Sequence, residues 1–229
     1  MAIYDGVAYE PILKLGKIIG WFAKHRVAAV SNVYVPEEID GYPVVEIGPS
    51  AFRNDELEYI SIPSSLTQID SKAFMDCKQL KSVTIYESKK PAPIHLMVIK
   101  ENAFKNCQSL KAITGTKILK LVGNGVFANC TALENVNNGI HFFGELPIAT
   151  FYMCTKLKEV WIIGDKVFLA DTCFYGCRNL SNIFFDCNSV ILNDKCISAI
   201  KNRNIICSHK CDVLDLAYMG LNVKVKELL

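Results

Sequence analysis

Ten cysteines are the residues of this 229-residue chain best suited to do chemistry. Half of them recur in one phrase, Phe-x-x-Cys-x-x-Leu, as in "FMDCKQL"; they are Cys77, Cys107, Cys130, Cys154 and Cys177. A metal site needs several ligands that converge on one point, whereas equivalent positions of a repeat form a line. The recurrence therefore favours buried structural thiols, stacked as a ladder, over metal or redox sites.

A second group of cysteines lies near the end of the chain, in "CSHKC" at residues 207–211, with Cys196 upstream. Cys207, His209 and Cys211 are residue types that bind zinc. However, Cys-x-His-x-Cys is not a standard zinc spacing. We therefore interpret this segment as part of a terminal cap, with a metal site as the alternative.

The other reactive side chains do not form a catalytic motif. None of the four histidines lies beside a nucleophile motif such as Gly-x-Ser-x-Gly; they are His25, His95, His141 and His209. The stretch "GNGVF" at 123–127 lacks the third glycine of a dinucleotide-binding loop, and a turn explains it better. We predict a protein that is not an enzyme and has no metal, no cofactor and no small-molecule substrate.

The element that positions the cysteines is a repeat anchored by phenylalanine. Six anchors follow one another at intervals of 22, 30, 23, 24 and 23 residues: Phe52, Phe74, Phe104, Phe127, Phe151 and Phe174. Apolar residues precede most anchors by eight and five positions, and a leucine follows each. A period near 23 residues lies within the range of leucine-rich repeats, about 20–29 residues.

Each repeat reads as a short turn followed by a strand. The strand signal is the alternation in Leu-x-x-Val-x-Ile, which places two apolar residues on one face. The Ala-Phe-x-x-Cys segment is compatible with one helical or 3₁₀ turn. Since one such unit cannot bury its apolar face, neighbours must stack, with strands about 4.8 Å apart. The prediction is a solenoid of the α/β class, rich in β-structure, with a parallel sheet on one face, short helical turns and terminal caps.

The repeat pattern divides this single structural domain into three parts. Residues 1–43 lack the repeat and are expected to form an N-terminal cap, residues 44–186 hold six repeats, and residues 187–229 hold a partial repeat and a C-terminal cap. The terminal parts would protect the open ends of the array.

The chain resembles the BspA-like leucine-rich-repeat proteins over nearly its whole length. The resemblance rests on "VPEEIDGYPVVEIGPSAF", "IPSSLTQIDSKAFMDCKQLKSVTI" and the closing "IICSHKCDVLDLAYMGLNVKV". Members of that family are commonly bacterial or protozoan surface proteins implicated in adhesion, and related arrays occur in phage genomes. The resemblance implies a noncatalytic binding scaffold.

Strand alternation predicts the solvent-facing side chains, which we take as partner-binding candidates: Tyr59, Tyr86, Asn135, Asn137, Glu159, Trp161, Phe184 and Asp186. Trp161 and Phe184 fall on neighbouring strands, and an exposed pair of this kind is typical of an interface hot spot. The alternative is that a cap, the N-terminal segment or another molecule covers the pair. A seven-residue insertion around "YESKKPAPIHL" would form a basic loop with Lys89 and Lys90, as a binding element or as neutral drift.

Charge and hydropathy narrow the class of partner. The 25 basic and 23 acidic residues are interspersed and give a net charge of +2, which predicts no nucleic-acid partner. No apolar run approaches the roughly 18 residues of a membrane span, and no signal peptide is recognisable. We expect a cytoplasmic protein, or one at the cell surface or in a virion if another route exports or assembles it. The predicted function is protein binding through the strand-lined face; the alternative is a structural or adhesive subunit of a larger assembly.

Overall fold

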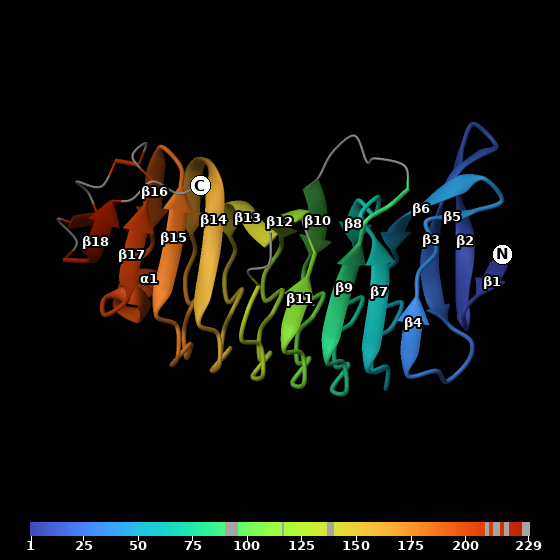
Figure 1. Ribbon diagram of the computed structural model, residues 1–229, viewed down its shortest axis with the longest axis horizontal. Helices are drawn as coiled ribbons and strands as arrows, with labels where there is room; N and C mark the ends of the chain where they lie inside the picture. The colour runs from blue at the N-terminus through green and yellow to red at the C-terminus, as the bar shows by residue number, and fades with distance from the viewer. Residues whose placement is uncertain are drawn as a thin grey trace.

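The protein is an elongated β-solenoid of about 8 turns, built almost entirely from strands (Figure 1). The computed structural model describes residues 1–89, 96–115, 117–136, 140–208, 211–212, 216–217 and 220–225. Coils follow one another along the long axis, so that residues about 23 positions apart in sequence lie side by side.

The N-terminal end is an antiparallel sheet. β1 (Ala2–Tyr4) pairs with β2 (Val7–Lys14), which pairs with β3 (Lys17–Arg26). β3 then pairs in parallel with β6 (Tyr42–Ile47), and β5 (Glu38–Ile39) folds back on β6. The indole nitrogen of Trp21 donates to the carbonyl oxygen of Ile39 at 3.0 Å, which ties β3 to this hairpin.

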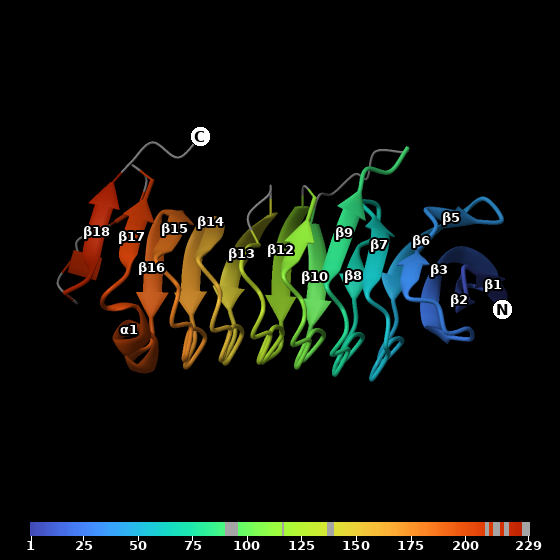
Figure 2. The same cartoon turned by 60° about the horizontal axis from the view of Figure 1, so that its bottom comes forward.

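Beyond this sheet, along the long axis of the molecule, the coils contribute strands to two rows. Within each row the neighbouring strands are parallel, and Figures 1 and 2 show the rows in two orientations. The front row holds β4 (Asn32–Tyr34), β7 (Tyr59–Pro63), β9 (Ser82–Tyr86), β11 (Ala112–Thr114), the first half of β14 (Glu159–Leu169), β15 (Asn182–Asp186), β17 (Asn204–Cys207) and β18 (Asn222–Val225). The second row holds β6, β8 (Gln68–Ile69), β10 (Leu96–Lys100), β12 (Lys117–Val122), β13 (Ile140–Leu146), the second half of β14 and β16 (Ser189–Leu192). β13 joins the two rows, because its residues Phe142 and Phe143 pair with the first half of β14 and Glu145 and Leu146 pair with the second half. The solenoid was predicted, but the second row was not.

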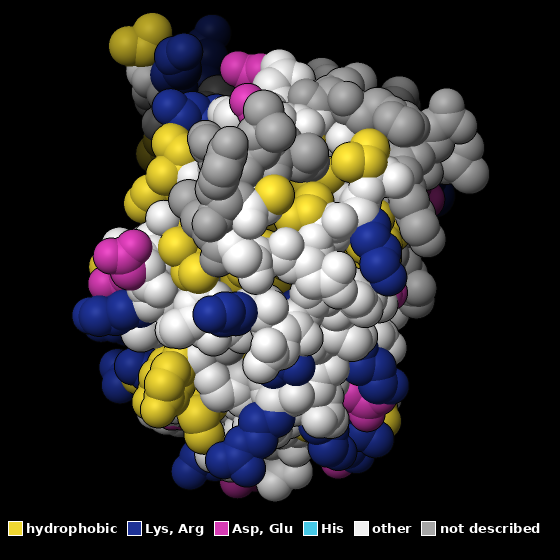
Figure 3. Space-filling model, turned by 90° about the vertical axis from the view of Figure 1, so that its left-hand side faces the viewer, with side chains coloured by type: hydrophobic (Ala, Val, Ile, Leu, Met, Phe, Trp, Pro, Cys, Tyr) yellow, Lys and Arg dark blue, Asp and Glu magenta, His cyan; other side chains and the backbone are white. Residues whose placement is uncertain are grey.

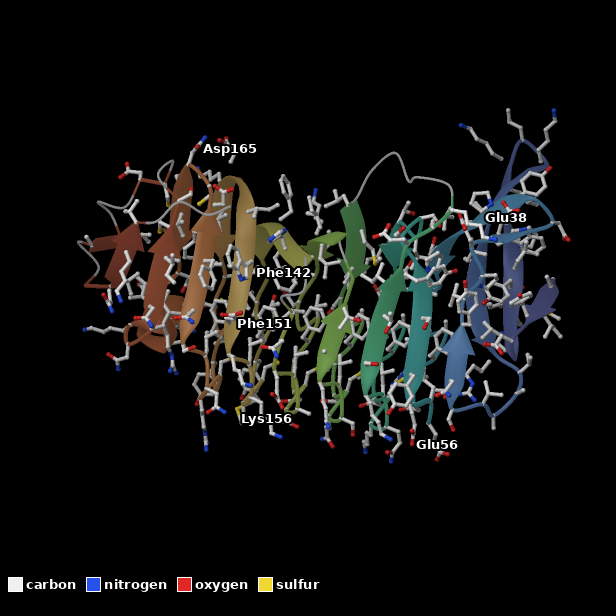
Figure 4. All side chains as sticks on the ribbon, in the orientation of Figure 1. Glu38, Glu56, Phe142, Phe151, Lys156 and Asp165 are labelled. Atoms are coloured by element: carbon white, nitrogen blue, oxygen red, sulfur yellow. The ribbon has the colours of Figure 1, made fainter. Side chains whose placement is uncertain are left out.

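The core between the rows is a stack of identical side chains. The six anchor phenylalanines are buried and nearly parallel, with successive ring centroids 5.1, 5.0, 5.4, 5.5 and 5.8 Å apart. Phe142 of β13 packs edge-on against Phe127 and Phe151, and Figure 4 shows Phe142 and Phe151 inside the solenoid. Because neighbouring coils bury the same positions, each coil completes the core of the next.

The turns around the phenylalanines are not helical, which corrects the prediction. Backbone hydrogen bonds three residues apart close them, such as Met75 N to Lys72 O at 3.1 Å. However, the residues two before and two after each anchor have positive φ: Ser50, Asn54, Lys72, Asp76, Asn102, Asn106, Gly125, Asn129, Ala149, Met153, Thr172 and Gly176. A left-handed residue on each side prevents a helix from propagating. The α-helix α1 (Asp194–Ile200) lies after the sixth repeat and is capped by Asn193.

Candidate interaction face

The outer side of the front row carries the aromatic pair that the sequence singled out. Trp161 of β14 and Phe184 of β15 are register partners, and their rings are stacked with centroids 4.0 Å apart and planes 9° apart. Val160 and Ile162, the strand neighbours of Trp161, are buried in the core, and so are Ile183 and Phe185, the neighbours of Phe184. Trp161 and Phe184 are half-buried, so each ring keeps part of its surface open to solvent.

A histidine completes this cluster, and the sequence analysis missed it. The imidazole of His141, on β13, lies edge-on to Trp161 with ring centroids 5.9 Å apart. Burial lowers the pKa of His141 below its usual value, and the nearby Asp186 opposes the shift only in part. The imidazole is therefore neutral at neutral pH. We call His141, Trp161 and Phe184 the aromatic cluster.

A polar ladder flanks the aromatic cluster along the same strands. Asn204 donates its side-chain amide to Asn182 at 3.0 Å, and Asn222 donates to Asn204 at 3.3 Å. The next residue of this ladder is Glu159, the register partner of Asn182. The recurring asparagine could have been found in the sequence, because it stands two residues after Leu180 and at the starts of β17 and β18. The aromatic cluster thus has a polar border of ordered amides.

The predicted tyrosines lie on the N-terminal half of the same face. Tyr59 is 43% exposed, and the Nζ of Lys81 lies 5.5 Å from its ring centroid, a cation–π geometry. Tyr86 is half-buried; it stacks on Tyr34 with centroids 4.8 Å apart and donates its hydroxyl to the carbonyl oxygen of Val35 at 2.7 Å. Burial raises the pKa of Tyr86. Tyr34, 46% exposed, was not among the predicted residues.

The remaining predicted residues are placed as follows. Asn135 is exposed and bridges to Ala112, whereas Asn137 lies outside the described residues. Asp186 ends β15, half-buried beside the aromatic cluster. In the insertion, the backbone nitrogen of Lys89 donates to Glu37 at 3.0 Å, and Lys90 lies outside the described residues.

The five ladder cysteines are buried, and each makes the same contact. Their thiols donate to the backbone carbonyl of the phenylalanine in the preceding coil at 2.8–3.1 Å, from Cys77 to Phe52 through Cys177 to Phe151. Burial raises the pKa of the Cys77 and Cys177 thiols to about 12. These thiols are therefore weak nucleophiles that satisfy a buried carbonyl.

The cysteines of the C-terminal part contact one another in pairs. Cys196 contacts Cys173, whereas Cys211 contacts Cys187. His209 lies outside the described residues. Among the residues that the structure describes, no three His, Cys, Asp or Glu side chains are arranged to hold a metal ion.

The comparisons with known proteins agree with the coil geometry. The family model described as "BspA type Leucine rich repeat region" matches residues 45–137 and 88–205. The chain belongs to this BspA-type family. No curated protein sequence matches significantly. The BspA-type solenoid superimposes on the T. pallidum leucine-rich repeat protein with a TM-score of 0.64 at 22% identity, over 98% of this chain and 97% of that one.

Two further solved structures are similar to this BspA-type chain. A leucine-rich repeat protein from Bacteroides ovatus has a TM-score of 0.50 and 19% identity, with 99% of this chain and 76% of that one covered. A leucine rich cell surface protein from Faecalibacterium prausnitzii has a TM-score of 0.33 and 16% identity, with 100% and 99% covered. At 19% identity the likeness to the Bacteroides ovatus structure shows the fold alone. No described helix has the length and apolar character to cross a membrane.

Proposed function

We propose that this chain is a noncatalytic scaffold that binds a protein partner through the outer face of its front row. The stacked pair of Trp161 and Phe184 carries the proposal. These are large aromatic side chains in register on neighbouring strands, and their rings remain partly open to solvent. Tryptophan is enriched at interface hot spots because it buries a large apolar area when a partner covers it.

The geometry around the pair lowers the cost of binding. The two rings are held against each other by strand register, and His141 supports the indole from the other side. Side chains that are already ordered lose little conformational freedom when a partner docks. The asparagine ladder and Asp186 supply polar groups at the border, as expected for the rim of a protein interface.

The test compares two double variants in partner capture. Immobilised wild-type chain, Trp161→Ala/Phe184→Ala and Tyr152→Ala/Tyr175→Ala are incubated with extract of the source cells, and bound proteins are quantified by mass spectrometry. Tyr152 and Tyr175 form a matched control, because they are also stacked, with centroids 5.3 Å apart, but lie in the turns beside Phe151 and Phe174.

We expect the first double variant to lose at least about 100-fold in affinity for a partner that the control still binds, the loss of two hot-spot residues. Its thermal unfolding should stay close to that of the wild type. Equal binding by both double variants, or unfolding of the first, would refute the assignment. In the alternative function, a structural or adhesive subunit, light scattering of the purified chain would reveal a self-assembled particle instead.

A further inference from the structure

The C-terminal end of the solenoid contains two pairs of thiols in contact with each other. The sulfur atoms of Cys187 and Cys211 are 3.8 Å apart, and those of Cys173 and Cys196 are 3.3 Å apart. Each ladder thiol instead points at a backbone carbonyl of the preceding coil. All ten cysteines are free. Two pairs of cysteines in the C-terminal half are thus close enough to form a disulfide bond.

The two pairs differ in access. Cys173 and Cys196 are completely buried, within the turn of the sixth repeat and α1. Cys211 has the largest exposed fraction of the ten cysteines, 8%. Figure 3 views the solenoid from its C-terminal end. A disulfide reagent or a thiol-disulfide oxidoreductase must reach the sulfur it reacts with, so the pair that includes Cys211 is the reactive candidate.

The surroundings of Cys211 favour its thiolate. The neighbouring thiols of Cys187 and Cys207 lower the pKa of Cys211 below its usual value. Burial and the carboxylates of Asp212 and Asp186 oppose the shift without cancelling it. In contrast, the contact with Cys211 and burial raise the pKa of Cys187. Access and pKa thus both favour Cys211 as the attacking sulfur and Cys187, 3.8 Å away, as the second sulfur.

We propose that Cys211 and Cys187 form a thiol–disulfide exchange site that accepts small disulfides of the glutathione type. The Cys211 thiolate attacks one sulfur of the reagent R–S–S–R, forms a mixed disulfide and releases R–S⁻. The sulfur of Cys187 then attacks the Cys211 sulfur and displaces the second R–S⁻, while the Cys187 proton passes to the leaving thiolate. The two protein sulfurs lose two electrons and the reagent gains them.

The Cys187–Cys211 disulfide would crosslink the last coils of the solenoid. Cys187 follows β15 directly, whereas Cys211 follows β17, so the bond closes a loop over 24 positions at the open end of the array. The end of a repeat array is where local opening begins, since its last coil has a neighbour on one side only. A crosslink there would make this end resistant to fraying in an oxidising environment.

The experiment titrates the full-length chain with oxidised glutathione and maps every cysteine by peptide mass spectrometry. We expect a Cys187–Cys211 disulfide to appear first, while Cys173, Cys196 and the ladder thiols stay reduced. In limited proteolysis, cleavage near the C-terminus should slow by about 300-fold, the factor expected from closing a loop of this length. A first bond between Cys173 and Cys196, or between Cys207 and Cys211, would overturn the assignment.

Two serine variants separate the roles of the two sulfurs. Cys187→Ser/Cys207→Ser should trap the glutathione mixed disulfide on Cys211, because both thiols that neighbour Cys211 are missing. Cys154→Ser is the matched control: it replaces a ladder thiol with another donor to Phe127 and should form the Cys187–Cys211 bond as the wild type does. Absence of the mixed disulfide from the folded double variant, with circular dichroism matching that of the wild type, would refute Cys211 as the nucleophile.

Discussion

Replacing a phenylalanine in the middle of the stack should cost more than replacing one at its end. Phe127 stacks on Phe104 and Phe151 at 5.4 and 5.5 Å and meets Phe142 edge-on at 6.3 Å. Among the described residues, Phe52 has a single ring partner, Phe74, at 5.1 Å. Both rings are buried, so leucine removes a similar apolar area at either position.

The difference between the two substitutions therefore isolates the ring contacts. Phe127 has two more aromatic partners than Phe52, and each aromatic pair contributes about 0.5–1.5 kcal/mol beyond its buried area. Phe127→Leu should lower the free energy of unfolding by about 1–3 kcal/mol more than Phe52→Leu. Because Phe127 stacks on rings of both neighbouring coils, its substitution weakens two coil interfaces, as expected for an array stabilised by nearest-neighbour interfaces.

Urea unfolding measures this difference, followed by far-ultraviolet circular dichroism and by tryptophan fluorescence. The two tryptophans, Trp21 and Trp161, report on the antiparallel end and on the array, so coincident transitions test two-state behaviour. An unchanged dependence of the free energy on urea shows that the comparison is valid. Equal costs for Phe127→Leu and Phe52→Leu would show that stacking adds nothing beyond burial.

Two further predictions concern a pH dependence and a strained turn. Since the folded-state pKa of His141 is lowered, stability should fall as pH drops through the unfolded value of about 6.5, and His141→Gln should flatten this slope in thermal melts despite the nearby Asp186. Met153 has a positive φ of 59° and occupies the turn position that Asn129 occupies in the preceding coil. The side-chain amide of Asn129 donates to Asn106 of the coil before it. Met153→Asn should therefore raise the free energy of unfolding by about 1 kcal/mol, measured by urea unfolding. A loss of stability there would mean that the contact of Met153 with Gly176 outweighs the strain.

The repeat could be predicted because each coil buries the same positions. Phe74, Cys77 and Leu80 are all fully buried, and their spacing recurs in the next coil at Phe104 and its neighbours. Burial against a similar coil allows few residue types at these positions, so the period can be recognised in the sequence. The outward direction of Trp161 followed from strand alternation, and the structure places it on the outer face, in register with Phe184.

The turns and the cysteine pairs could not be predicted, because no single residue type recurs at the positions that determine them. The left-handed position two after each anchor is held by Asn106 and Asn129 but also by Met153, so composition alone does not reveal the backbone. Cys173 and Cys196 meet because α1 occupies the coil position after the sixth repeat. His141 joins the aromatic cluster through the pairing of β13 with β14, which requires knowledge of strand register.

The solenoid separates the residues that hold the fold from those that can bind. Val160 and Ile162 alternate with Trp161 along one strand, so substitution of the outward ring leaves the core contacts of its neighbours in place. Stability is a sum over coils, whereas recognition is concentrated on a few outward positions. Under the proposed function, substitution of Trp161 and Phe184 therefore changes recognition and leaves the coil unchanged. By the same reasoning, a variant of these two rings that unfolds the chain would show that the aromatic cluster belongs to the core.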